Sequence, residues 1–184
     1  VVDREKIIDG RTIAPGDTVL GLPSVGLHTN GYSLARKLFF EIAACAPDAY
    51  LGALNATIGE ALLRPHASYL RVLEGLLDGG LIKGLAHITG GGLTENIPRI
   101  LPEGTNVEIQ IGSWPVLPVF EVMQQIGNVA EAEMFRTFNM GVGMVIVGAE
   151  SDAAKIKAHV ESSGDACYQI GRVTRGDQRV SYVR

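Results

Sequence analysis

Three consecutive glycines mark the segment of this chain with the clearest chemical potential, Thr89-Gly90-Gly91-Gly92. They follow an apolar stretch, 85–88, that predicts a buried strand, and they precede a helix predicted to end before Pro102. Glycines at such a turn let the backbone approach a ligand closely, and the free amides of a first helical turn favour an anion such as phosphate. A tight strand-to-helix turn without a ligand would use the same residues, so the glycines alone leave both interpretations open.

Two nucleotide-binding patterns are excluded by the residues around the glycines. No Lys-Ser or Lys-Thr pair follows the triple glycine, as a Walker P-loop requires. A second glycine pair, in Gly141-Val142-Gly143, precedes a predicted strand at 144–147 instead of a helix. That order removes the physical basis of a dinucleotide fingerprint.

A second polar segment, 24–33, lies between a predicted strand and a predicted helix. Its hydroxyl, amide and imidazole groups offer the density of donors and acceptors that a phosphosugar or an amidine requires. Thr29 or Asn30 would serve equally well as a helix cap. His28, taken alone, is more typical of a structural or surface histidine.

A third polar segment, 133–143, lies between a predicted helix and a buried strand. Arg136 could pair with a phosphate and Asn139 could hydrogen-bond a ligand, although an ion pair with a glutamate is the alternative for Arg136. His66 and His159 are predicted to lie in helices without partners, as ordinary surface or core residues.

The composition favours a globular domain and weakens several functional classes. The 184 residues are 46% hydrophobic, which is enough for a sizeable core in a single domain, 1–184. A net charge of −4 with scattered Lys and Arg argues against nucleic acid as a partner. No apolar run approaches the length of a membrane span, and the amino terminus lacks a signal-peptide pattern. Cys45 and Cys167 lack metal-ligand spacing, so buried thiols in a reducing cytoplasm are expected.

Hydrophobic periodicity and turn residues predict alternating strands and helices, with the chain opening on β structure and resembling a piece cut from a longer protein. Strands are expected at 6–10, 18–22, 85–88, 107–111 and 144–147, with a closing hairpin that pairs 166–173 with 178–183. Helices are expected after Gly31 and at 58–63, 67–77, 118–125, 129–135 and 151–162, the last capped by Ser151. The fold class is therefore α/β (α+β), a mixed β-sheet with packed helices.

The three polar segments together resemble the carboxyl-terminal domain of the aminoimidazole ribonucleotide synthetase family, the phosphoribosylformylglycinamidine cyclo-ligases. Segments 24–36, 87–102 and 133–145 occur in that family's order, and so do 62–69, 127–129 and 170–173. Related synthetases and kinases of the superfamily usually carry an aspartate in the glycine turn. The sequences HITGGG at 87–92 and HTNGYS at 28–33 favour the cyclo-ligase.

This resemblance implies ATP-dependent ring closure of formylglycinamidine ribonucleotide in purine biosynthesis. ATP activates the formyl oxygen, an amidine nitrogen attacks that carbon, and phosphate leaves. ATP and Mg²⁺ would be bound mainly by an amino-terminal domain that is absent from this chain, so no metal ligand is predicted here and the fragment alone is expected to be inactive. The expected partners are a phosphoribosyl substrate, that domain and, in the complete enzyme, a second copy in a cytoplasmic homodimer.

The resemblance also assigns residues to the site. His28 is the expected catalytic residue, as a polar contact or proton relay. The expected substrate-binding residues are Ser24, Thr29, Asn30, Gly31, Ser33, Thr89, Gly90, Gly91, Gly92, Asn96, Arg136 and Asn139. A non-catalytic ligand-binding or assembly module, and another ATP-dependent synthetase of the superfamily, are the alternatives.

Overall fold

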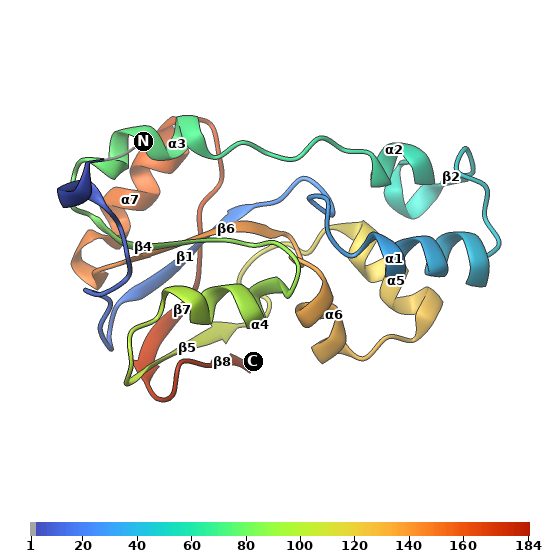
Figure 1. Ribbon diagram of the computed structural model, residues 1–184. Coiled ribbons are helices and arrows are strands. Elements are labelled where there is room, and N and C mark those ends of the chain that lie inside the picture. Colours follow the sequence, from blue (N-terminus) through green and yellow to red (C-terminus); the bar gives the residue numbers. More distant parts are fainter. Residues whose placement is uncertain (1–2) are drawn as a thin grey trace.

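A six-stranded sheet organises the computed structural model, which describes residues 3–184 (Figure 1). Its strands lie in the order β4-β6-β1-β7-β5-β8. They comprise β1 Thr18–Pro23, β4 Ile82–His87, β5 Thr105–Gln110, β6 Val142–Gly148, β7 Tyr168–Arg175 and β8 Val180–Val183. Neighbouring strands are antiparallel except for β5 and β8, which run parallel. The predicted mixed sheet is confirmed.

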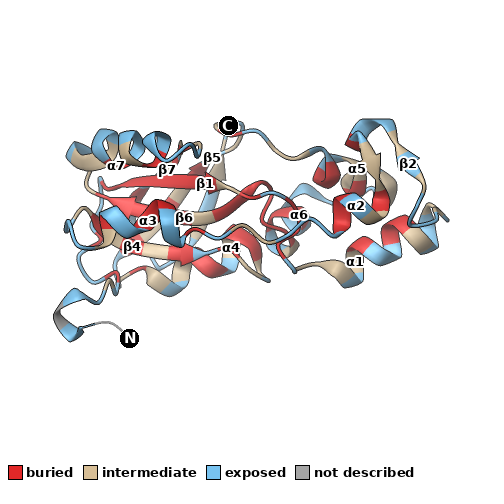
Figure 2. Ribbon diagram, turned by 90° about the horizontal axis from the view of Figure 1, so that it is seen from above, coloured by how far each residue is buried: buried red, intermediate tan, exposed pale blue. Residues whose placement is uncertain are grey.

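Helices cover both faces of the sheet and build a lobe at one end (Figures 1 and 2). One face carries α3 Leu70–Leu77 and α7 Glu150–Ser162, and the other carries α4 Gly92–Asn96 and α6 Glu131–Thr137. The lobe contains α1 Tyr32–Arg36, its π-helical continuation η2 Lys37–Ile42, α2 Ile58–Leu62, α5 Pro118–Gly127 and the small hairpin β2 Tyr50–Leu51 and β3 Ala56–Thr57. Short 3₁₀ turns occupy η1 Arg4–Lys6, η3 Gly52–Leu54 and η4 Ile97–Ile100. No helix within residues 3–184 is long and apolar enough to cross a membrane.

The alternation of side chains along β1 divides the interior into two cores. Val19 points to the larger core, which extends into the lobe, whereas Leu20 and Leu22 point to a smaller core beneath α3 and α7. Because successive strand residues face opposite sides, a central strand covered on both faces reads as an unbroken apolar run. The predicted strand at 18–22 is therefore confirmed and is buried on both faces.

The expected hairpin between the last two strands is wrong, because β5 lies between β7 and β8. The Asn106 side chain at the start of β5 accepts hydrogen bonds from the backbone amides of Asp177 (2.7 Å) and Arg179 (2.9 Å). The amide of Gln178 donates to the Thr105 carbonyl at 2.7 Å. These contacts carry the turn around the end of β5, so β8 joins the sheet on the far side of that strand.

Several local expectations also differ from the structure. The segment 6–10 forms no strand; its first residue ends η1, and the two residues before Asp3 lie outside the described part of the chain. Segment 64–69 has no regular secondary structure, so the helix expected at 67–77 begins at Leu70, whose side chain is exposed. The amino-terminal cap of α7 is Ala149, not Ser151. The other predicted helices are present with small shifts at their ends.

A substitution at Gly171 in β7 tests whether the close approach of β7 to β5 requires glycine. A Cβ at this position would overlap the backbone carbonyl oxygen of Glu108. We expect Gly171→Ala to lower the free energy of unfolding by about 2–3 kcal/mol, because backbone atoms cannot move aside cheaply. Urea denaturation followed by circular dichroism measures this. Gly79→Ala is the control, since its Cβ would meet only ordinary contacts; equal stability of both variants would contradict the expectation.

Candidate functional site

The three polar segments singled out in the sequence meet beyond the ends of β1, β4 and β6. The amide of Ile88, at the end of β4, donates to the Gly143 carbonyl at 2.9 Å. The Asn30 side-chain oxygen lies 3.2 Å from the position of a Cβ on Gly90. Thr94 Oγ1 donates to the Phe135 carbonyl at 3.3 Å. The loop at 24–31, the glycine turn at 89–92 and the segment 135–143 therefore form one continuous structure.

The glycine turn is shaped by packing and by one buried amide. Gly92 has a positive φ of 56°, and a Cβ there would overlap the carbonyl oxygens of Phe135 and Phe138. Asn96, which is 4% exposed, donates to the carbonyls of Gly92 (2.8 Å) and Gly90 (3.2 Å) and accepts from Thr89 Oγ1 at 3.1 Å. Asn96 thus holds the turn from inside.

The amides at the outer side of this turn are available for a ligand. Gly92 N–H donates to the Thr89 carbonyl at 3.1 Å. Within residues 3–184, the N–H groups of Gly90 and Gly91 donate to no protein acceptor, and the Gly90 residue is exposed. Gly91 is partly exposed, and amides without a protein acceptor at the start of a helix are able to donate hydrogen bonds to an anion.

Asn139 joins the polar loop to the third segment. Its Oδ1 accepts from Ser24 Oγ (2.8 Å) and from the Gly141 amide (2.9 Å), and its Nδ2 donates to the Gly26 carbonyl at 2.9 Å. Ser24 and Asn139 are 3% and 2% exposed. The structure therefore places both side chains behind the loop, where they fix its course.

His28 is buried inside the loop and holds its shape from within. Its Nε2 accepts from the backbone amides of Val25 (3.1 Å) and Ala67 (3.4 Å), and its Nδ1 is buried without a partner among the described residues. Burial, reinforced by the neighbouring His66 and His87, lowers the pKa of His28 to about 4. The ring is consequently neutral at pH 7, with its proton on Nδ1.

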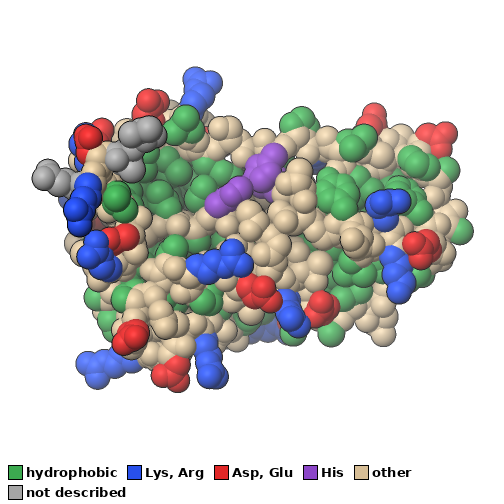
Figure 3. Space-filling model, viewed as in Figure 1, with side chains coloured by type: hydrophobic (Ala, Val, Ile, Leu, Met, Phe, Trp, Pro, Cys, Tyr) green, Lys and Arg blue, Asp and Glu red, His purple; other side chains and the backbone are tan. Residues whose placement is uncertain are grey.

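Three of the four histidines form a row that the sequence did not reveal. The rings of His28 and His66 stack with centroids 4.1 Å apart, and His66 Nε2 lies 2.9 Å from His87 Nε2. The expectation that His66 lies in a helix without partners is wrong, because it occupies the segment without regular secondary structure before α3. Figure 3 shows histidines grouped on the surface beside an apolar hollow. No spacing rule links these positions, which lie far apart in the sequence.

The remaining predicted site residues lie at the rim. Arg136 pairs with Glu95, its Nε 3.1 Å from Oε1, so the ion pair weighed as the alternative for Arg136 is present. Both side chains are largely exposed, and Glu95 lies beside Gly91. Ser33 and Thr29 are exposed, and Thr29 Oγ1 donates to the His28 carbonyl at 2.6 Å. Gly31 has a positive φ and lies against the ring of Phe138.

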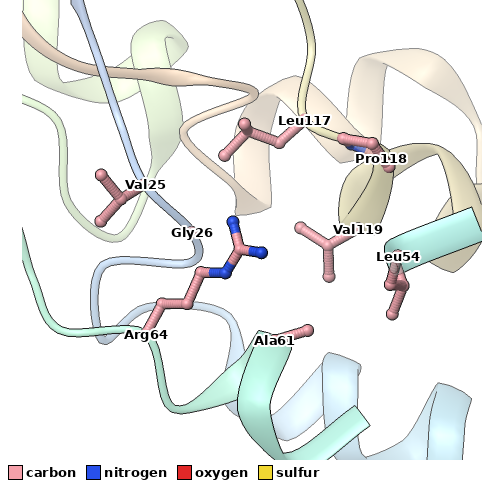
Figure 4. A pocket seen from close by; sticks show the side chains of 8 residues that line it. All are labelled: Val25, Gly26, Leu54, Ala61, Arg64, Leu117, Pro118 and Val119. Atoms are coloured by element: carbon pink, nitrogen blue, oxygen red, sulfur yellow. The ribbon is translucent and has the colours of Figure 1, made fainter. Parts of the chain in front are cut away.

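One small cavity borders the loop at 24–31, and one open apolar hollow lies away from it. A space of about 30 Å³ is lined by side chains that include Val25, Leu54, Arg64 and Val119, with the Arg64 guanidinium directed into it (Figure 4). It has room for ordered water but not for a phosphoribosyl group. An open hollow of about 420 Å³ is lined mainly by Ile7, Ile8, Leu77 and Leu85. It leaves apolar surface beside η1 and β4.

The described residues offer no cluster that suits Mg²⁺. Within residues 3–184, no three His, Cys, Asp or Glu side chains are grouped so as to hold a metal ion. Mg²⁺ prefers octahedral oxygen ligands, which this convergence of amides and imidazoles does not supply.

Comparison with known proteins places this chain in one domain family. Residues 14–184 match the family model described as "AIR synthase related protein, C-terminal domain". The chain is 46% identical over 176 residues to a phosphoribosylformylglycinamidine cyclo-ligase of Geobacillus thermodenitrificans, covering 96% of this chain and 51% of that protein. It is 42% identical over 182 residues to the cyclo-ligase of Brevibacillus brevis, covering 99% and 53%. The chain thus spans about half the length of these curated relatives.

Solved structures with the same fold are more distant in sequence. Thiamine-monophosphate kinase from Stenotrophomonas maltophilia superposes with a TM-score of 0.66 at 17% identity, covering 98% of this chain and 54% of that chain. HypE of E. coli superposes with a TM-score of 0.65 at 20% identity, covering 95% and 48%. At this identity the likeness establishes the fold alone.

The buried neutral His28 predicts an acid-sensitive loop. Its pKa is lower in the folded than in the unfolded chain, so its contribution is present above pH 6.5 and is lost as the pH falls towards about 4. We expect the free energy of unfolding to drop by roughly 2 kcal/mol between pH 7 and pH 5 from this residue. His28→Asn, which tolerates the positive φ of 50° at this position, should lose less over that range.

Urea denaturation of both proteins at pH 7 and pH 5 measures the difference. His159→Asn is the control, because it removes a histidine outside the row. Parallel losses in the wild type and in His28→Asn would contradict the expectation.

Proposed function

This chain belongs to the AIR synthase related family as its C-terminal domain, and from that premise we propose that it is half of a phosphoribosylformylglycinamidine cyclo-ligase. The observation that carries the proposal is the 42–46% identity to cyclo-ligases along 96–99% of this chain. The chain forms one domain, 1–184, and an amino-terminal domain completes the enzyme. The complete protein closes the imidazole ring of aminoimidazole ribonucleotide in the cytoplasm, as a homodimer.

The domain's part in the reaction is to hold the phosphoribosyl substrate. The free amides of Gly90 and Gly91 donate hydrogen bonds to the phosphate oxygens, and the exposed residues Thr29 and Ser33 carry hydroxyls on the neighbouring loop. Arg136 turns from Glu95 towards the phosphate when substrate arrives. Both ends of that ion pair are solvated, so exchanging the partner costs little.

The buried residues of the predicted site hold the exposed ones in place. Asn96 holds the glycine turn, and Ser24 and Asn139 hold the loop that carries Thr29, Asn30 and Gly31. His28 fixes the same loop from inside, and its unpaired Nδ1–H is the group through which it would act as a polar contact or proton relay. Holding reacting groups in place supplies a large part of the rate enhancement in such a reaction.

ATP and Mg²⁺ belong to the absent half in this proposal. ATP supplies the phosphoryl group that turns the formyl oxygen into a leaving group. The donors present here suit an anion, and the acidic ligands that Mg²⁺ needs are not grouped among residues 3–184. The apolar hollow beside η1 and β4 is surface that the other domain would cover.

A chimera tests the whole proposal. The amino-terminal half of the Geobacillus thermodenitrificans relative, joined to this chain, should convert formylglycinamidine ribonucleotide to aminoimidazole ribonucleotide with consumption of one ATP. The relative itself is the positive control, and this chain alone should be inactive. A folded chimera that binds the substrate without turnover would indicate a non-catalytic module. Turnover of a different amide or phosphate acceptor would indicate another synthetase of the superfamily.

Gly90→Ala tests the phosphate site within that chimera. The backbone at Gly90 has no positive φ and a Cβ would meet only Asn30 Oδ1 at 3.2 Å, so the fold should survive. The added methyl group would stand where the phosphate approaches, and we expect KM to rise on the order of tenfold with kcat less affected. Gly52→Ala is the control, because nothing lies within 4 Å of its Cβ. An unchanged KM for Gly90→Ala would remove the turn from the binding site.

A further inference from the structure

The outer end of the histidine row presents two imidazole nitrogens to one point. His66 Nε2 and His87 Nε2 are 2.9 Å apart, and the ring centroids are 5.0 Å apart with planes inclined by 49°. Without another group, one ring must donate and the other accept across this contact. His87 is exposed and His66 half-buried, so water reaches the pair.

This spacing is slightly shorter than the separation of two imidazole nitrogens on one metal ion. Two imidazole nitrogens bound at about 2.1 Å and separated by an angle of roughly 90–110° lie about 3.0–3.4 Å apart. The corresponding ring centroids lie about 4.5–5.2 Å apart, a range that includes the observed separation. Small rotations of the rings therefore suffice to aim both lone pairs at one ion.

The backbone is fixed at both positions, and the His66 ring is also fixed by stacking. His87 ends β4, where it pairs with Met144, and the following amide of Ile88 donates to the Gly143 carbonyl. His66 stacks on the buried His28, and the adjacent Ala67 amide donates to His28 Nε2. A pair held this way loses little conformational entropy when it binds an ion.

We propose that His66 and His87 form an open two-histidine site for a borderline divalent cation such as Zn²⁺, Ni²⁺ or Cu²⁺. Imidazole suits these ions, whereas Mg²⁺ and Ca²⁺ prefer oxygen. On binding, the shared Nε2 proton moves to the Nδ1 of the same ring by exchange with water, so both rings stay neutral. Water or an anionic ligand fills the remaining positions. The site is distinct from a closed structural zinc site, since no third protein ligand is grouped with the pair within residues 3–184.

Equilibrium dialysis of the 184-residue chain with NiCl₂ or ZnCl₂ at pH 7.5 tests the proposal. We expect one ion per chain in the wild type and a loss of affinity of at least about tenfold in His87→Asn and in His66→Asn. His159→Asn, which removes the fourth histidine of the sequence, should bind the ion as the wild type does. MgCl₂ should neither bind to this pair nor compete with Ni²⁺ or Zn²⁺ for it.

Two further measurements separate ligation from a loss of structure. The wild-type and His159→Asn melting temperatures should rise with Zn²⁺, whereas that of His87→Asn should not. In the wild type, NMR signals of the His66 and His87 imidazole nitrogens should shift on titration with Zn²⁺ while those of His159 stay in place. Wild-type affinity no higher than that of the His87 variant, or an equal loss in His159→Asn, would overturn the proposal.

Discussion

The hydrogen bonds of one buried amide, Asn139, join two of the three polar segments, the loop at 24–31 and the turn before β6. The amide satisfies the Ser24 hydroxyl, the Gly26 carbonyl and the Gly141 amide at once, far from water. If the loop separated from the turn before β6, the buried amide would lose its partners and the full desolvation cost would destabilise the fold. Phe138, next to Asn139, also contacts the other segments: its ring lies against Gly31 and its carbonyl oxygen lies against Gly92.

Close packing and open access to solvent both require glycine in this site, and the sequence does not distinguish the two. Gly31 and Gly92 lack side chains because the ring of Phe138 and the carbonyls of Phe135 and Phe138 occupy that space. Gly90 is open towards solvent, with only Asn30 nearby. Packing therefore accounts for Gly92, whereas Gly90 has the open surroundings that the proposed phosphate site requires. In that proposal, the two interpretations of the triple glycine apply to different residues of the same turn.

The histidine row connects this convergence to the surface. His28 is neutral and fixed by backbone amides, His66 stacks on it, and His87 is exposed at the end of β4. Burial, together with the neighbouring imidazoles, lowers the pKa of His28 and the pKa of His87. His87 lies two residues before Thr89, so this exposed histidine and the glycine turn belong to one stretch of backbone.

The sequence by itself determined the elements whose signals are local: the strands at 18–22 and 107–111, most helices, and the polar turns between them. Period-two and helical patterns together with glycine and proline positions specify such elements within a few residues. It also determined the family, through motifs carried by consecutive residues. Tertiary structure alone decided that β8 pairs with β5. The Asn106 side chain, at the start of β5, binds the backbone amides of Asp177 and Arg179, which are 71 and 73 residues later in the sequence. Tertiary structure likewise decided that Ser24, Asn96 and Asn139 are buried and that three distant histidines form a row. Burial and long-range contacts arise only when the chain packs, so no periodic pattern in the sequence predicts them.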